Sequence, residues 1–354
     1  MTRKRTINKL SWVINSECNL NCVHCYPSSD TEPKKKMEKD FFDYFRANTD
    51  GVKFKRIFVS GGEPILDRQF LKYVELAKEL GDKVFICSNG TLLTSELVTE
   101  LASKKVAGIV LSLQALSESE CLEVYGVSDI FCKVKNIIPI IQKCKLDLSI
   151  EMTIMKHTYQ NIEKFVSTFR NMGVNSFSFK RLVKVGRACM NDVELTPEEN
   201  YKALIRIFNL HLQSKDISIN VHDPLYGTLV YDYYKDKKDL KNYDRLMSGY
   251  SCRAGARWIG IDPSGNVSPC PLMLYQGIII GNVLEKPLIK ILDESKTMLQ
   301  LQESRLIGDN TCKYGAVCFG CKVASIEHSG NMFAKDPMCI FEDCKCPAVK
   351  REVV

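Results

Sequence analysis

Three cysteines near the N-terminus have a spacing that could hold an iron–sulfur cluster. They form the sequence Cys18-x3-Cys22-x2-Cys25, in which three thiols share one short loop. Thiolates are the usual protein ligands of a 4Fe–4S cluster, and three of them can bind three of its four irons. The fourth iron would stay open for a small molecule, as a catalytic metal site requires. Two simpler interpretations are three reduced structural cysteines and a zinc site that lacks one ligand.

This loop resembles the cluster loop of the radical S-adenosylmethionine (SAM) superfamily. Residues 18–26 read Cys-Asn-Leu-Asn-Cys-Val-His-Cys-Tyr, and the resemblance runs through most of the chain. In that family SAM chelates the open iron through its amino and carboxylate groups. One electron then cleaves SAM to a 5′-deoxyadenosyl radical, which abstracts hydrogen from the substrate. The resemblance implies that Cys18, Cys22 and Cys25 are catalytic and that Tyr26 flanks the adenine.

Other motifs match family positions that contact SAM. Glycines after a strand let the backbone approach a ligand closely, and exposed carbonyls can accept hydrogen bonds from an ammonium group. A Gly-Gly-Glu-Pro motif stands in such a place and resembles the family's contact to the methionine amine. The resemblance implies that the cofactor-binding residues include Gly61, Gly62, Glu63, Pro64, Ser88, Asn89 and Ser112.

Two segments depart from the pattern of the family's peptide-modifying branch. Residues 112–115 read Ser-Leu-Gln-Ala where that branch often has Ser-Leu-Asp-Gly, and Tyr125 stands where an arginine often binds the SAM carboxylate. Lys180 or Arg181, at the end of a predicted strand, could supply the missing cation. Residues 186–188, Gly-Arg-Ala, resemble a family turn whose role could equally be structural.

The elements that must position these residues follow a βα rhythm. Apolar runs, typical of buried parallel strands, alternate with helical patterns and predict right-handed βα units. The predicted strands cover residues 11–14, 57–60, 84–87, 109–113, 148–152 and 177–179. Six units predict an α/β fold, a partial (β/α)6 TIM-like barrel over residues 8–215, with its chemistry in the loops after the strands. A tyrosine- and charge-rich bridging region over 216–250 follows.

A cysteine-rich domain is predicted over residues 251–346. Its Gly, Pro and Cys content is typical of a small domain stabilised by metal. Residues 261–267 predict a β-hairpin that brings Cys252 and Cys270 together. The arrangement resembles the SPASM domain, an extension with auxiliary iron–sulfur clusters; a zinc ribbon is the alternative.

The SPASM resemblance implies two sets of cluster ligands. Cys252, Cys270 and Cys321 would hold an inner cluster, and Cys312, Cys318 and Cys339 an outer one. Three further residues could complete the outer cluster: Asp309, Cys344 and Cys346. The five remaining cysteines are predicted to be small core residues: Cys87, Cys121, Cys132, Cys144 and Cys189.

The composition limits the expected cellular location of the protein and the classes of partner it could bind. The 354 residues are 45% hydrophobic and 26% charged, and no apolar run reaches the roughly 20 residues of a membrane helix. Without a signal peptide or a membrane helix, we expect a soluble cytoplasmic protein with no membrane partner. The net charge of +7 is spread along the chain, which disfavours nucleic acid and fits a solvated surface or an acidic substrate.

The preferred function is SAM-dependent modification of a ribosomally synthesised peptide by cross-linking, oxidation or epimerisation. Expected partners are the precursor peptide, an electron donor such as flavodoxin or ferredoxin, and a separate leader-peptide-binding protein. Residues 320–324 and 336–339 also resemble enzymes that modify side chains of haem or haem d1 precursors, which gives a tetrapyrrole alternative. Few cations are expected in the loops at the strand ends, whereas that polyanion would need several. A third interpretation is a non-enzymatic iron–sulfur electron carrier.

Overall fold

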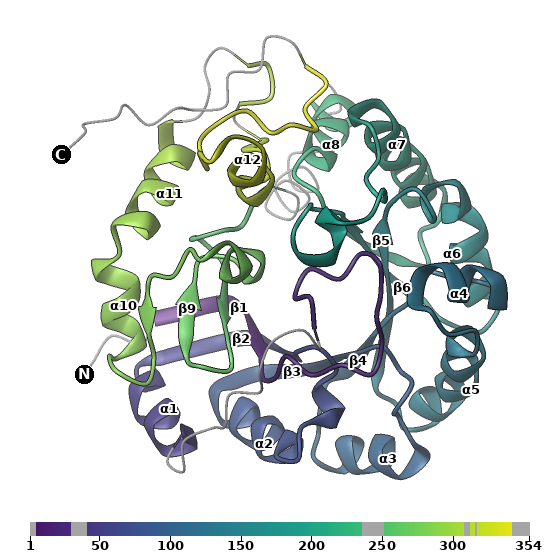
Figure 1. Cartoon of the computed structure of the whole chain (residues 1–354), viewed down its shortest axis with the longest axis horizontal. Coiled ribbons are helices and arrows are strands. Elements are labelled where there is room, and N and C mark those ends of the chain that lie inside the picture. The colour runs from purple at the N-terminus through teal and green to yellow at the C-terminus, as the bar shows by residue number, and fades with distance from the viewer. Residues whose placement is uncertain (1–4, 30–40, 236–250, 308–311, 316, 342–354) are drawn as a thin grey trace.

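A computed structural model describes residues 5–29, 41–235, 251–307, 312–315 and 317–341. A single ten-stranded sheet runs through these residues in the order β10-β9-β8-β1-β2-β3-β4-β5-β6-β7 (Figure 1). The strands are β1 (Arg5–Val13), β2 (Val52–Ser60), β3 (Gly81–Ser88), β4 (Gly108–Ser112), β5 (Asp147–Ile154), β6 (Ser176–Arg181), β7 (Ser218–His222), β8 (Trp258–Ile261), β9 (Asn266–Ser268) and β10 (Gly281–Asn282).

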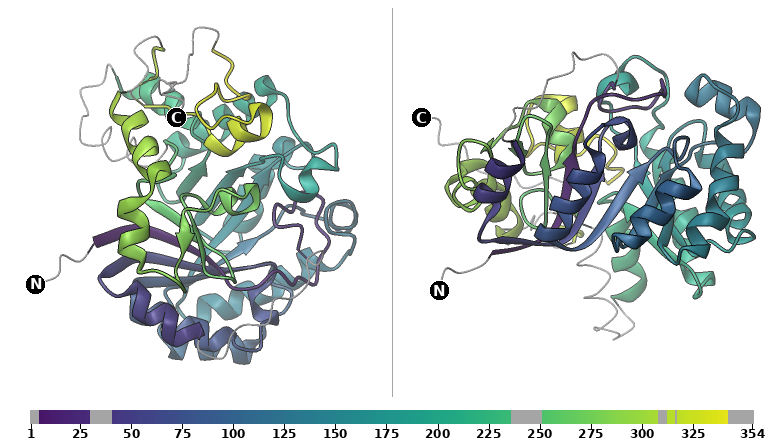
Figure 2. Two further views of the ribbon diagram at one scale, coloured as in Figure 1. Left: turned by 60° about the vertical axis from the view of Figure 1, so that its left-hand side comes forward. Right: turned by 90° about the horizontal axis from the view of Figure 1, so that it is seen from below.

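The helices lie mostly around the outside of this sheet (Figure 1). They are α1 (Phe41–Thr49), α2 (Phe70–Leu80), α3 (Ser95–Ser103), α4 (Glu118–Tyr125), α5 (Ile130–Lys143), α6 (Ile162–Arg170), α7 (Pro197–Gln213), α8 (Tyr226–Tyr234), α10 (Leu288–Glu294), α11 (Lys296–Ile307) and α12 (Lys322–Ser329). Helices α10 to α12 lie towards the β1 side, and α4 to α7 lie by β5 and β6 (Figures 1 and 2).

The predicted partial barrel is confirmed, and the structure adds a strand to it. Strands β1 to β7 pair in parallel in chain order, so all six predicted strands are present. Strand β7 pairs with β6 beyond residue 215, and α8 follows it. The described part of the predicted bridging region, 216–235, therefore continues the barrel.

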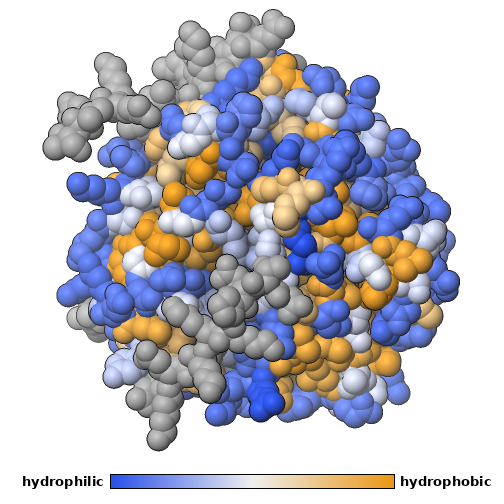
Figure 3. Space-filling view, viewed as in Figure 1, coloured by the Kyte–Doolittle hydropathy of each residue, from blue (hydrophilic) through white to orange (hydrophobic). Residues whose placement is uncertain are grey.

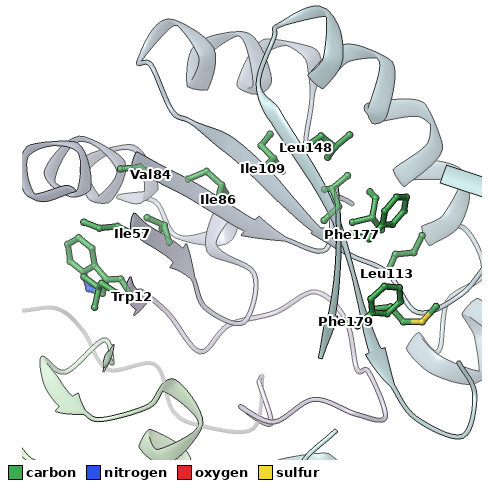
Figure 4. Packing of buried hydrophobic residues seen from close by; sticks show 14 of the residues in the cluster. Trp12, Ile57, Val84, Ile86, Ile109, Leu113, Leu148, Phe177 and Phe179 are labelled. Atoms are coloured by element: carbon green, nitrogen blue, oxygen red, sulfur yellow. The ribbon is translucent and has the colours of Figure 1, made fainter. Parts of the chain in front are cut away.

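The core lies between the sheet and its helices. Every second side chain of a strand points to the same face, so Ile57, Ile86 and Ile109 pack beneath the helices (Figure 4). The other face of the same strands is turned to the inside of the barrel. The core consequently rigidifies the strands whose ends carry the motifs.

Local sequence explains where several helices begin. The Thr94 side chain accepts a hydrogen bond from the Leu97 amide, which caps α3. Helix α7 starts with a capping box between Thr196 and Glu199, with Pro197 at its first turn. These caps satisfy amides that have no partner within the helix.

The C-terminal part is joined to the barrel through the sheet. Strands β8 and β9 form the predicted hairpin, with Ile261 opposite Val267. Asp262 holds the turn by accepting from the amides of Ser264 and Asn266, at 2.8 and 2.9 Å. Strand β8 also pairs in parallel with β1, so the hairpin continues the barrel sheet.

The surface is mixed in character. Hydrophobic side chains form patches between hydrophilic ones on the face shown in Figure 3. Among the described residues, no helix has the length and apolarity needed to cross a membrane.

Candidate active site

The cluster loop, residues 14–29, follows β1 and lies at the centre of the ring of strands and helices (Figure 1). The Ile14 amide donates to the Ser60 carbonyl at 2.8 Å, so the loop leaves β1 alongside the end of β2. The Val23 amide donates to the carbonyl of Val124 in α4 at 3.0 Å. The loop is thus fixed to both sides of the barrel mouth.

The three thiols of this loop are half-buried and unoxidised. Burial raises the pKa of Cys22, and negative charge on Cys25 and Cys18 raises it further. Such thiols favour the neutral form until a positive centre compensates their charge. This mutual influence places the three sulfurs in one neighbourhood.

The three thiols suit a 4Fe–4S cluster, because each thiolate can bind a different iron of one cluster. Within the described ranges, no three Cys, His, Asp or Glu side chains are grouped closely enough to hold a single metal ion.

The Gly61–Pro64 loop packs directly on the cluster loop. The amides of Gly62 and Glu63 donate to the carbonyls of Asn15 and Glu17, at 3.0 and 2.7 Å. A Cβ atom on Gly62 would lie 2.3 Å from the Glu17 carbonyl oxygen, which is a severe clash. The glycine is therefore required for this approach. Pro64 is buried and starts a short 3-10 helix, Pro64–Leu66.

Glu63 joins this loop to the end of β3. Its carboxylate is fully buried and accepts from the Ser88 hydroxyl at 2.9 Å and from the Asn89 amide at 2.8 Å. Burial raises the pKa of Glu63 to about 7, against the opposing effect of these donors. The Asn89 side chain in turn lies 4.0 Å from the Cys18 sulfur and donates to Asn19 at 3.0 Å. The loops after β1, β2 and β3 thus form one connected network.

The two departures from the family pattern touch each other. The Gln114 amide donates to the hydroxyl of Tyr125, and the Gln114 side chain donates to Ser112 at 3.0 Å. Its carbonyl oxygen accepts from the Thr153 amide at 2.6 Å. Gln114 and Tyr125 therefore replace an aspartate and an arginine with a neutral buried network.

Tyr26 connects the cluster loop to the C-terminal segment. Its ring meets the ring of Tyr275 edge-on, with 5.2 Å between centroids. Tyr275 lies in the 3-10 helix Pro271–Gln276, directly after Cys270. Burial raises the pKa of Tyr26, so its hydroxyl stays protonated.

The two cations assigned to the cofactor, Lys180 and Arg181, have different surroundings in the structure. Lys180 lies on the inner face and pairs with Glu151 at 2.6 Å. Arg181 is buried and forms two hydrogen bonds of 2.6 Å with Asp336, so its charge is already compensated. This pairing argues against Arg181 as the partner of the SAM carboxylate. Sequence reasoning could not place Asp336 beside it, because 155 residues separate the two.

The inner face of the barrel below the loop is aromatic and basic. Phe58 and Phe85 stack at 5.3 Å, and the Lys9 ammonium lies 5.4 Å from Phe58 and 5.2 Å from Trp258. Burial and neighbouring cations lower the pKa of Lys9 to about 7. The His222 ring, 5.5 Å from Trp258, has its pKa lowered by burial and by Lys9 and Lys180. No sequence motif marked these residues, since strand pairing brings them together.

A basic pocket opens at the lower end of this face. Its volume is about 460 Å³, within the range of small-molecule sites. It is lined by the cationic residues Lys9, Lys55, Arg56, Lys83, Arg253 and Arg257, together with Asn8 and Asp82. Strand register explains part of the cluster, because Arg56 lies beside Lys9 and Lys83 on the neighbouring strands.

Three late cysteines lie near one another. Charge on Cys252 and Cys321 adds to the burial that raises the pKa of Cys270. Burial raises the pKa of Cys321 to about 12, with Arg181 opposing the shift. The Asp336 carboxylate also accepts from the Cys321 amide at 2.7 Å. The hairpin and the Asp336 turn thus bring together the predicted inner ligands.

The predicted outer ligands Cys312, Cys318 and Cys339 lie in local turns formed with Tyr314 or Asp336. The Tyr314 amide donates to the Cys312 sulfur at 3.4 Å, and the Cys318 amide donates to the Tyr314 carbonyl at 2.8 Å. The Cys339 amide donates to the Asp336 carbonyl at 2.9 Å. Three candidates lie outside the described residues: Asp309, Cys344 and Cys346.

The prediction that the other cysteines are core residues is largely wrong. Cys121 is buried, but Cys132 and Cys189 are exposed and Cys144 is half-buried. Cys87 is half-buried on the inner face of β3, where burial and Glu151 raise its pKa to about 12. These cysteines do lie in or near predicted helices and strands, but most of their side chains do not point into the hydrophobic core.

Comparison with known proteins agrees with this geometry. Residues 12–170 match the radical SAM superfamily, and residues 252–322 match the SPASM iron–sulfur cluster-binding domain. A radical SAM domain implies a 4Fe–4S cluster and SAM, and a SPASM domain implies auxiliary iron–sulfur clusters.

Relatives that match over most of the chain include a heme synthase and a mycofactocin maturase. The chain is 24% identical over 345 residues to the AdoMet-dependent heme synthase of Methanosarcina barkeri, covering 95% of this chain and 97% of the relative. It is 23% identical to the mycofactocin maturase MftC of Mycolicibacterium smegmatis, covering 98% and 85%. The structure of Streptococcus suis SuiB bound to its precursor peptide SuiA has a TM-score of 0.74 at 19% identity, covering 98% and 76%.

Proposed function

This chain is a radical SAM enzyme with a SPASM domain, and we propose that it abstracts a hydrogen atom from a ribosomally synthesised peptide to cross-link, oxidise or epimerise it. The observation that carries the chemistry is the contact of three strand-end loops: the cluster loop, residues 14–29, lies on Gly61–Pro64 and on Asn89. When bound, the cluster supplies the electron that cleaves SAM to the 5′-deoxyadenosyl radical. The inner face of the barrel lies directly below.

The cluster loop and its neighbours have proposed roles in binding. Cys18, Cys22 and Cys25 hold the cluster, and Tyr26 flanks the adenine. The Gly61–Pro64 backbone accepts the methionine amine. This assignment is supported by the packing of the segment on the cluster loop, where the amides of Gly62 and Glu63 donate to the carbonyls of Asn15 and Glu17.

The remaining polar residues are proposed to orient SAM. Glu63 is fully bonded to Ser88 and Asn89, so it shapes the turn rather than reacting. Ser112 is half-buried at the end of β4 and is the proposed contact to the ribose or carboxylate. Lys180 remains a candidate for the carboxylate, although Glu151 already shares its charge.

The auxiliary domain would accept an electron or position the substrate. Cys252, Cys270 and Cys321 are the proposed inner ligands, supported by the mutual influence of their charges. Cys312, Cys318 and Cys339 remain the proposed outer set. An external flavodoxin or ferredoxin and a separate leader-peptide-binding protein remain proposed partners.

A peptide substrate is supported by the sheet edge. Strand β7 is the last strand on its side, so within the described residues its outer edge has no strand partner. An extended peptide can pair with such an edge, which satisfies its backbone as it enters the barrel. His222 at the end of β7 reaches the Trp258 ring, so this edge leads to the inner face. The names of MftC and SuiB fit this choice.

A tetrapyrrole is the second candidate, and the basic pocket favours it. Cations are present on the inner face, where Lys9, Arg56 and Lys83 lie side by side. They lie in the first half or middle of their strands and not at the carboxyl ends, where few cations were expected. Propionate carboxylates need such cations, and a flat ring fits aromatic walls like Phe58 and Phe85. The heme synthase relatives fit this alternative.

Anaerobic turnover decides between the two. The reconstituted enzyme is incubated with SAM, reductant and either a precursor peptide encoded beside the gene or a haem precursor, and products are identified by mass spectrometry. Loss of hydrogen or a new cross-link in the peptide supports the proposal. Side-chain oxidation or decarboxylation of the tetrapyrrole, with the peptide unchanged, refutes it.

A charge-reversed variant sharpens this comparison. Arg56→Glu combined with Lys83→Glu changes exposed side chains of the basic pocket, away from the loops proposed to bind SAM. SAM cleavage without substrate should be unchanged. Tetrapyrrole turnover would fall strongly if its carboxylates bind there, whereas pairing of a peptide backbone with β7 would be unaffected.

A further inference from the structure

Arg187 is bonded to the cluster loop at three places. It lies in the 3-10 helix Gly186–Cys189, after β6. Its amide donates to the Cys25 carbonyl at 2.9 Å, its Nε to the Cys22 carbonyl at 3.0 Å and its Nη1 to the Ser29 carbonyl at 2.7 Å. Two of these acceptors belong to residues proposed to bind the cluster. One arginine therefore spans the loop.

The turn that carries Arg187 is shaped to approach this loop. Gly186 has a φ of +62°, and a Cβ atom there would lie 2.4 Å from the Tyr26 carbonyl oxygen. The Asn191 side chain donates to the carbonyls of Val23 and Arg187, at 3.1 and 2.8 Å. Gly186, before Arg187, and Asn191, after it, thus hold the turn against the cluster loop.

The charge of Arg187 is buried without a compensating carboxylate. The residue is only 7% exposed, and none of the salt bridges between described residues involves it. Its Nη2 is buried and has no hydrogen-bond partner there. An unpaired buried guanidinium is costly, so such a group calls for an anion that the polypeptide does not supply.

The cluster loop brings the Cys22 and Cys25 thiols close to this charge, because Arg187 donates hydrogen bonds to the backbone carbonyls of both residues. A 4Fe–4S cluster held by thiolates is anionic and gains a further negative charge on reduction. Net charge and hydrogen bonding around a cluster set its reduction potential. A fixed cation at this place therefore stabilises the reduced cluster more than the oxidised cluster.

We propose that Arg187 is a positioning residue that raises the reduction potential of the SAM-cleaving cluster. It holds the carbonyls of Cys22 and Ser29 and supplies the buried positive charge that the cluster compensates. This inference goes beyond the proposed function, and it holds for a peptide or a tetrapyrrole substrate alike.

The test is a redox titration of the reconstituted protein followed by electron paramagnetic resonance. The cluster with the open iron is recognised because SAM changes its signal, whereas auxiliary signals should not respond. In Arg187→Gln we expect its midpoint to become more negative by at least about 59 mV, a tenfold change in the reduced-to-oxidised ratio. In Arg187→Lys, which keeps the charge, the shift should be smaller.

Arg206→Gln is the matched control. Arg206 also donates to two carbonyls, those of Tyr159 and Gln160, but these belong to a different loop. Its replacement should leave the SAM-sensitive midpoint unchanged. An unchanged midpoint in iron-loaded Arg187→Gln overturns the proposal. If that variant loses its cluster, Arg187→Lys decides: a tenfold or larger change in the ratio despite the retained charge also overturns it.

Discussion

Arg181 and Asp336 form a buried bidentate ion pair that joins the end of β6 to the turn before Cys339, with both hydrogen bonds at 2.6 Å. The same carboxylate accepts from the amides of Cys321 and Met338, at 2.7 and 3.0 Å. The negative charge of Asp336 therefore links the barrel to the backbone of Cys321, a proposed auxiliary ligand, and of Met338, the residue before another, Cys339.

Breaking this pair should be costly. Asp336→Asn leaves Arg181 buried with reduced compensation, for which a loss of about 3 kcal/mol is expected. We expect a clear fall in the thermal midpoint and a loss of iron from the auxiliary domain. The exposed pair Arg170–Asp216 provides the control, because Asp216→Asn should cost less than about 1 kcal/mol. Equal midpoints for the two variants would contradict a joining role for Asp336.

Glu63 should make stability depend on pH. Its folded-state pKa is raised to about 7 from 4.5. Between these values the unfolded chain loses the Glu63 proton while the folded chain keeps it, so stability falls as pH rises. The loss is on the order of 3 kcal/mol and is complete above pH 7. Relative to wild type, Glu63→Gln should therefore gain stability as pH rises from 4.5 to 7.

Thermal unfolding across this pH range measures the effect. Glu303→Gln, at an exposed carboxylate on α11, is the control and should run parallel to wild type. If Glu63→Gln also ran parallel to wild type, the buried carboxylate would not be protonated in the folded protein.

The sequence was sufficient to predict the barrel and the loops that carry the motifs. Parallel strands end at the same edge, so Cys18, Gly62 and Asn89 were expected near one another from strand order alone. The pairing of β8 with β1 was not predicted, because the two strands are far apart in the chain and periodicity carries no information on partners. For the same reason, the basic inner face around Lys9 and Trp258 was missed.

The role of the cations was harder to predict than their position. Arg181 stands at the correct strand end, but its partner Asp336 becomes visible only in the folded chain. Arg187 looked like part of a structural turn, and its three bonds to the cluster loop depend on how that loop folds back. Local sequence predicts where a charge lies along the chain, whereas its compensation depends on distant residues.

Lys9 should destabilise the protein at neutral and acidic pH. Its pKa is lowered to about 7 from 10.5 by burial and by neighbouring cations. Between these values the unfolded chain binds a proton that the folded chain does not, so stability rises with pH. Lys9→Met removes the penalty and should stabilise by on the order of 2 kcal/mol at pH 6, since the group is half-buried.

The stability gained by Lys9→Met should shrink towards pH 10. Thermal midpoints of the variant and the wild type, measured at pH 6 and pH 9, test this. Lys55→Met, at an exposed lysine of the same pocket, should give little change at either pH. A destabilised Lys9→Met protein at pH 6 would show that the contacts of Lys9 with Phe58 and Trp258 outweigh its buried charge.

Iron content tests the assignment of the late cysteines. The anaerobically reconstituted protein should bind more than the four irons of one cluster. Cys252→Ala combined with Cys270→Ala should lower the iron content while SAM cleavage is retained. Four irons per chain, with zinc bound to the C-terminal cysteines, would instead establish a zinc ribbon.

Formation of 5′-deoxyadenosine tests the central claim most directly. The reconstituted wild-type protein, supplied with SAM and a strong reductant, should release 5′-deoxyadenosine and methionine. The triple variant Cys18→Ala, Cys22→Ala, Cys25→Ala should release none, while it keeps the iron of its auxiliary clusters. Undiminished release by the triple variant, or no release by the iron-loaded wild type, would contradict the account.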